Sequence, residues 1–132
     1  MATCASANRR LMSSRLVGDS YADWRDRLAS ANDPAFLPIE EIDRRLAEGL
    51  AQFWCDGRAA LVTEIVQHPG GAVTVDSLAA TGRRKSLTEV IEPAVREWAS
   101  GFATHLRIIG RPGWARVWPD WRHEQSILTK PL

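Results

Sequence analysis

The chain has 132 residues, of which 45% are hydrophobic and 25% are charged, a balance that is ordinary for one globular domain. Its 17 basic and 16 acidic residues leave a net charge of +1, which excludes a strong overall field for attracting nucleic acid or an anionic membrane. No apolar run approaches the roughly 20 residues that a membrane-spanning helix requires.

The N-terminal segment differs from the rest of the chain. Residues 1–18 are small, polar and basic with little periodicity, and residues 1–10 have no apolar core typical of a signal peptide. We expect residues 1–18 to form an irregular arm that becomes ordered on a partner, and residues 19–132 to form a single domain.

Cysteine and histidine spacing indicates no metal site. Cys4 and Cys55 lie far apart, and neither they nor His68, His105 and His123 show a ligand spacing typical of zinc. We expect both cysteines to be reduced, in an intracellular setting.

Two helices are predicted before the first strand. Residues 19–28 indicate a short helix with Asp19 or Ser20 as its N-cap, ended by the polar break at 31–34. Pro38 favours the start of a second helix. Its predicted buried seam consists of Ile39, Ile42, Leu46 and Leu50.

Three apolar segments predict an antiparallel meander. A strand at 52–55 is followed by Asp56-Gly57, a strong two-residue turn signal. The β-branched segments 59–66 and 72–78 then flank a turn at 67–71 that contains Pro and two Gly residues.

A basic loop at residues 81–85 leads into an amphipathic helix. Ser86 and Glu89 match a capping box, and Gly101 suits the helix end. Pro93 predicts a kink within this helix. The expected apolar stripe consists of Leu87, Val90, Ile91, Ala94, Val95, Trp98 and Phe102. A strand at 104–109 would complete a right-handed βαβ crossover, so the sheet should be mixed.

The C-terminal region is rich in tryptophan. A turn at 110–113, a short helix at 114–118 and a final strand at 125–129 are predicted. Two interpretations of Trp114, Trp118 and Trp121 stay open: a small aromatic core that closes the sheet, or an anchoring surface for another chain. Base stacking is disfavoured by the near-neutral charge, so we expect no nucleic-acid partner.

Four segments together carry a family resemblance: residues 59–65, 92–99, 110–117 and 128–132. They resemble the "LVTEI" strand, the "P-A-x-x-x-W-A" helix, the "G-R-x-G-W-x-R" segment and the "L-x-K-x-L" ending of small proteins encoded by tailed bacteriophages. Those proteins are similar to GCN5-related N-acetyltransferases (GNAT). The resemblance spans residues 39–132 and implies an α+β fold, with a mixed, mostly antiparallel sheet, a central βαβ crossover and flanking helices.

The resemblance also implies where acetyl-CoA would bind. In active GNAT enzymes a Q/R-x-x-G-x-G/A loop and the following helix N-terminus hold the pyrophosphate. The matching positions here are Gly82, Arg83, Arg84, Lys85 and Ser86, which contain one glycine and no such motif. The three cations suit a solvated loop, or a contact with an anion or a partner.

The catalytic residues of the family are matched only in part. The usual general acid is a tyrosine near the late short helix, whereas residues 114–122 contain none and the only tyrosine is Tyr21. Glu64 is a weak candidate for a general base, and a cross-strand charge is the alternative interpretation.

These departures favour a phage-encoded protein that keeps the GNAT-like scaffold without its chemistry. We expect a virion structural or accessory component, located in the virion or the host cytoplasm, that contacts other virion proteins or further copies of itself. It would require no cofactor and would have no membrane partner. The alternative is an acetyl-CoA-dependent N-acetyltransferase with an atypical loop.

Overall fold

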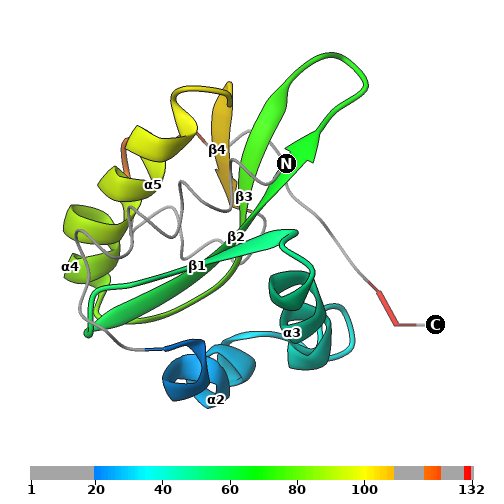
Figure 1. The fold of residues 1–132 in the computed structure, drawn as a ribbon, viewed down its shortest axis with the longest axis vertical. Coiled ribbons are helices and arrows are strands. Elements are labelled where there is room, and N and C mark those ends of the chain that lie inside the picture. Colours follow the sequence, from blue (N-terminus) through cyan, green and yellow to red (C-terminus); the bar gives the residue numbers. More distant parts are fainter. Residues whose placement is uncertain (1–19, 109–117, 123–129, 132) are drawn as a thin grey trace.

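The described residues of the protein form a four-stranded sheet with helices on both faces (Figure 1). The computed structural model describes residues 20–108, 118–122 and 130–131. The elements are α2 (Tyr21–Ala31), α3 (Ile39–Ala47), β1 (Ala51–Cys55), β2 (Ala59–Gln67), β3 (Val73–Gly82), α4 (Arg84–Ser86), the π-helical turn η1 (Leu87–Ile91), α5 (Glu92–Ala99) and β4 (His105–Ile108).

The strand order is β1-β2-β3-β4. The β1–β2 and β2–β3 pairs are antiparallel, and the β3–β4 pair is parallel across the intervening helix. The predicted mixed, mostly antiparallel α+β architecture is therefore confirmed. The arm at 1–18, the helix at 114–118 and the strand at 125–129 lie outside the described residues, apart from Trp118, which is not helical.

Helix α2 begins as predicted, with Ser20 as its N-cap. The Ser20 backbone N–H donates to Asp23 Oδ2 at 2.8 Å, which forms half of a capping box. Trp24 and Leu28 are buried on one face of the helix. The helix continues to Ala31, three residues beyond the predicted end.

Helix α3 ends earlier than predicted. It stops at Ala47 because Gly49 has a φ of +76° and the Leu50 N–H donates to Arg45 O at 2.8 Å, the hydrogen bond of a Schellman ending. Leu50 therefore lies outside the helix with 54% of its surface exposed, so its prediction as a buried seam residue is wrong. Ile42 is fully buried, as expected.

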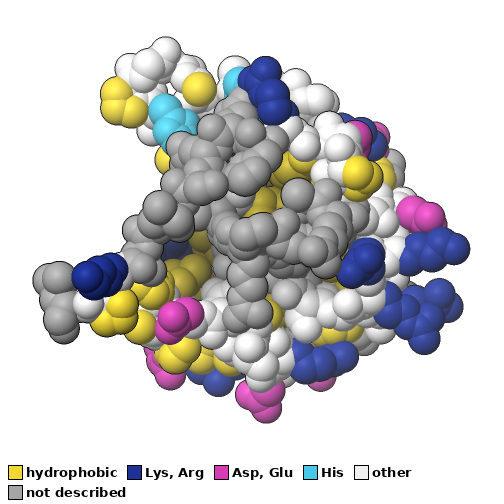
Figure 2. Space-filling view, turned by 180° about the vertical axis from the view of Figure 1, so that it is seen from behind, with side chains coloured by type: hydrophobic (Ala, Val, Ile, Leu, Met, Phe, Trp, Pro, Cys, Tyr) yellow, Lys and Arg dark blue, Asp and Glu magenta, His cyan; other side chains and the backbone are white. Residues whose placement is uncertain are grey.

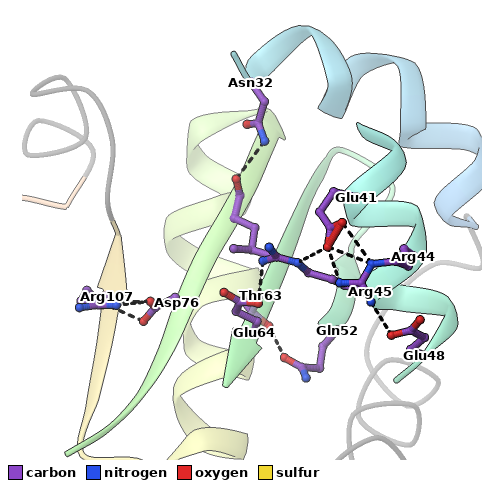
Figure 3. A network of polar contacts seen from close by, with 11 residues as sticks. Asn32, Glu41, Arg44, Arg45, Glu48, Gln52, Thr63, Glu64, Asp76 and Arg107 are labelled. Atoms are coloured by element: carbon purple, nitrogen blue, oxygen red, sulfur yellow. Dashed lines mark hydrogen bonds and ion pairs between the residues drawn. The ribbon is translucent and has the colours of Figure 1, made fainter. Parts of the chain in front are cut away.

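A bulge shifts the side-chain alternation of β3. Val62 pairs with Ala79 and Thr63 with Ser77, so Leu78 is an extra residue on β3. Leu78 and Ala79 consequently both pack toward α2 and α3. The side-chain amide of Asn32, just after α2, donates to the Leu78 carbonyl at 3.2 Å (Figure 3).

Two apolar cores lie on the two faces of the sheet. The core on the α5 side contains large side chains from β1, β2, β3 and α5, including Trp54, Leu61, Val75 and Trp98. The core on the α2 and α3 side is smaller and is built around Trp24, Leu28, Ile42 and Val62. This face assignment decides which polar side chains on the strands can meet.

The predicted long helix exists as one continuous segment from α4 through η1 to α5. Its capping box is wrong, because Arg83 is the N-cap and Ser86 is buried inside the first turn. Within η1 the Glu92 N–H donates to Leu87 O, an i to i−5 hydrogen bond. Pro93 has no N–H and its ring would crowd the carbonyl four residues earlier, so a wider turn before it relieves the clash.

The π-helical turn exchanges two side chains. Val90, expected in the apolar stripe, is 40% exposed, whereas Glu92 is only 8% exposed. An extra residue per turn rotates Glu92 above Leu87 and moves Val90 outward. The helix thus presents a carboxyl group to the sheet.

Candidate functional site

The predicted cofactor-binding residues meet at the junction of β3 and the long helix. Gly82 is the last residue of β3, Arg83 is the N-cap, and α4 begins immediately afterwards. Only Arg83 separates strand from helix, so the basic loop predicted for residues 81–85 is far shorter than expected.

Gly82 brings this junction against the β1–β2 turn. Its φ is +103°, and a Cβ atom there would lie 2.5 Å from both the Ala59 Cα and the Arg58 carbonyl oxygen. The Arg83 N–H donates to that carbonyl oxygen at 2.9 Å. Two loops that are distant in sequence are therefore held together through backbone atoms.

The result is a group of four exposed cations, Arg58, Arg83, Arg84 and Lys85, which we name the cationic corner. None of the four forms an ion pair with another residue in the described part of the chain. Lys and Arg side chains gather along the right-hand edge in Figure 2, the side that carries α4. The N-cap Arg83 supplies no side-chain acceptor, so no side chain caps the first-turn N–H groups of the helix.

Most of the described arginines outside the cationic corner are paired with carboxylates, whereas Arg27 lies over the Trp24 ring. Arg25 pairs with Asp43 at 2.7 Å. Arg107 pairs with Asp76 at 2.5 Å through two guanidinium nitrogens, as Figure 3 shows. Arg44 and Arg45 both contact Glu41 and hold the pKa of that carboxyl at about 2. Among the described residues, the cationic corner therefore brings together four cations that no ion pair neutralises.

Glu64, the predicted general base, is engaged in one of these pairs. Its Oε2 accepts a hydrogen bond from Arg45 Nη1 at 2.9 Å, which links β2 to α3 (Figure 3). Its neighbours Thr63 and Ile65 face the α5 side, so Glu64 faces away from the long helix. Glu64 is thus held in an ion pair between a strand and a helix, and its partner does not lie on a neighbouring strand.

Tyr21, the only tyrosine of the chain, ties the two N-terminal helices together. Its hydroxyl donates to Asp43 Oδ1 at 2.6 Å, and its ring meets Phe53 edge-on with centroids 5.7 Å apart. Burial, followed by the hydrogen bond to Asp43, raises the pKa of Tyr21 above its ordinary value. It is a poorer acid than a free phenol.

A small cleft on the α5 side holds the polar groups that the sequence did not reveal. Thr63, Ser77 and Glu92 line it together with apolar side chains, and its inner space of about 10 Å³ suits one water molecule. Burial, assisted by the negative charge of Asp120, raises the pKa of Glu92 against the opposing effect of Arg96. The only sequence signal that pointed to the burial of Glu92 was Pro93, because a proline at that position favours the wider turn that rotates Glu92 inward.

The predicted interface tryptophans divide between the core and the undescribed region. Trp118 is 6% exposed and belongs to the core on the α5 side, and Trp121 stacks on it with ring centroids 5.2 Å apart. This arrangement matches the aromatic-core interpretation for these two residues. Trp114 lies outside the described residues.

Neither a metal cluster nor a membrane span is found in the described part of the chain. No three or more His, Cys, Asp and Glu side chains there come together to hold a metal ion. His68 contacts the Thr74 hydroxyl at 2.8 Å, and Cys55 is buried. No helix among the described residues has the length and apolar character needed to cross a bilayer. Cys4 and His123 are outside these residues.

Comparisons of the chain with models of known families, with curated proteins and with solved structures gave no match. The resemblance to GNAT-like phage proteins therefore stays a prediction.

Proposed function

We propose that this chain is a GNAT-like phage protein that acts through protein–protein contacts, as a virion structural or accessory component, without acyl transfer. The observation that carries the proposal is that Glu64, the weak candidate for a general base, and Tyr21, the only tyrosine, are both bound to structural partners. Tyr21 is bound to Asp43 and Glu64 to Arg45, so both groups join structural elements to one another. A general acid or base must instead reach a substrate proton directly or through one water.

The junction at Gly82 supports the same proposal. A pyrophosphate cradle needs small residues so that phosphate can approach backbone N–H groups. Here bulky Arg84 and Lys85 occupy the first helical turn, and only Arg83 separates it from the strand. The nearby cleft has space for a water molecule rather than for an acyl chain.

A binding experiment tests the proposal. Acetyl-CoA at about 100 times its dissociation constant would stabilise a binding protein by roughly 2.7 kcal/mol, which is visible as a rise in melting temperature. We expect no saturable shift at millimolar acetyl-CoA and no release of the coenzyme thiol with amine acceptors. Saturable stabilisation together with acetyl transfer would refute the proposal.

One observation favours acetyl-CoA-dependent N-acetyltransferase activity as a second candidate. The parallel pairing of β3 with β4 ends at Ser77 and Ile108, whereas β3 continues to Gly82. Among described residues, the last part of β3 thus has no partner on the β4 side and leads directly to the exposed helix N-terminus. This geometry offers an anion a place beside the strand. In this case the melting shift would appear and would be reduced by Arg84→Glu.

A further inference from the structure

The cationic corner is an unusual surface for a chain with a net charge of +1. Four cations lie within two short segments that touch through the hydrogen bond between the Arg83 N–H and Arg58 O. At physiological ionic strength the screening length is about 8 Å, so any of these cations that approach within that distance repel one another. Ion pairs like those formed elsewhere by Arg25 and Arg107 would remove this repulsion.

The acidic residues near the corner do not neutralise it. Asp56, in the β1–β2 turn, accepts the backbone N–H groups of Arg58 and Ala59 at 2.9 Å each, so it stabilises the turn itself. Glu89 lies four residues after Lys85, a spacing that often gives an ion pair, yet none forms. The corner thus presents positive charge to whatever approaches it.

The backbone at the corner is fixed while its side chains remain exposed. Gly82 packs against Arg58 and Ala59 at distances that exclude a Cβ atom, which fixes the relative position of the two segments. A partner would therefore meet cations on a rigid base, and little entropy would be lost in ordering the backbone on binding.

We propose that the cationic corner is the contact surface for an acidic segment of a partner protein. Arginine forms bidentate hydrogen bonds with carboxylates, and lysine adds a compact positive charge. Nucleic acid fits less well, since no aromatic side chain accompanies the four cations in the described structure to stack on a base. The inference rests on the proposed function, because it names the kind of partner that the contact requires.

The test uses a fluorescein-labelled octaglutamate peptide and the full chain at low ionic strength, followed by fluorescence anisotropy. We expect saturable binding that weakens as salt is raised. The double variant Arg84→Glu/Lys85→Glu should lose at least about tenfold in affinity, equivalent to 1.4 kcal/mol. Arg58→Glu, on the other segment, should weaken binding in the same direction.

A pair of variants with equal charge change separates local from overall charge: Arg58→Gln removes one positive charge from the corner and should weaken binding, and Arg44→Gln removes one elsewhere. Arg44 lies on α3, where it is paired with Glu41 and Glu48, so its variant should leave the affinity within about twofold. Equal binding by the double variant and the wild type would overturn the proposal. So would tighter binding of an oligothymidylate of the same length.

The outcomes distinguish this inference from the proposed function. Saturable acetyl-CoA binding that displaces the peptide would overturn both and favour the acetyltransferase. If acetyl-CoA does not bind, and the wild type binds the peptide no more tightly than the double variant does, only the acidic-partner inference fails. Melting temperatures of all variants verify that they are folded, as expected for substitutions of exposed residues.

Discussion

Substituting Gly82 by alanine tests the close approach that creates the cationic corner. The change places a Cβ atom where the Ala59 Cα and the Arg58 carbonyl oxygen lie 2.5 Å away, a separation at which backbone must move. It also imposes a φ of +103° on a residue with a side chain. Gly71→Ala is a matched control, because Gly71 has a φ of +98° but no atom within 4 Å of the added Cβ.

The two variants should differ by the cost of the clash. Holding a non-glycine residue in a sparsely populated backbone region costs about 1–3 kcal/mol, which applies to both. Forcing an extra methyl group into packed structure adds about 1–3 kcal/mol, which applies to Gly82 alone. We therefore expect a loss of about 2–6 kcal/mol for Gly82→Ala and about 1–3 kcal/mol for Gly71→Ala.

Urea denaturation followed by tryptophan fluorescence measures both losses, with the free energy of unfolding extrapolated to water. A typical domain has only about 5–15 kcal/mol in total, so the Gly82 variant should unfold at visibly lower urea. Equal losses in the two variants would show that Gly82 has room for a side chain. The described contact between the β1–β2 turn and the helix start would then be wrong.

Three further predictions concern buried polar groups. Glu92→Gln should raise the free energy of unfolding at neutral pH. Because the pKa of Glu92 is raised in the folded state, its contribution to stability is present below its unfolded-state pKa, near 4.5, and is lost as the pH rises through its folded-state pKa. The melting temperatures of the two proteins should therefore converge in acid. Thr63→Val should cost about 2–4 kcal/mol in urea melts, since Trp54 Nε1 loses its acceptor and Gln52 Oε1 its donor inside the core. Asn32→Ala should cost about 1 kcal/mol, because the bulged Leu78 carbonyl loses its amide partner, and an unchanged unfolding midpoint would contradict that role.

Much of the fold was predictable because its signals are local. Ser20, one of the two N-cap residues that the sequence indicated, caps α2, and the turn signal at Asp56-Gly57 joins β1 to β2. The parallel β3–β4 pair followed from the length of the helical segment between the two strands. The cap and the turn depend on neighbouring residues alone, and the strand pair depends on the length of the connection between the strands.

The errors arose where the chain departs from regular periods. A stripe with 3.6-residue spacing places Val90 inside, but the π-helical turn before Pro93 buries Glu92 in its place. Leu50 continued the seam of α3 in sequence, but Gly49 ended the helix first. A capping box at Ser86 was plausible by motif, but β3 extends to Gly82 and the helix begins at Arg84.

The candidate site was less predictable than the fold, because ion pairing is a tertiary property. The sequence named Glu64, but not its partner Arg45 nineteen residues earlier. It named the cations at Arg83, Arg84 and Lys85, but Arg58 joins them only through the close approach at Gly82. Asp76 and Arg107 were not singled out, since only the parallel register brings them together.

The tryptophan pairs of the α5-side core give this protein a built-in optical reporter. Trp54 and Trp98 lie 5.4 Å apart at 61°, and Trp118 stacks on Trp121 at 5.2 Å. Indole transitions at such separations couple electronically and produce a paired band of opposite signs in circular dichroism. Loss of the Trp54–Trp98 contribution to that band would reveal the separation of α5 from β1 without any attached dye, even while the backbone signal persists.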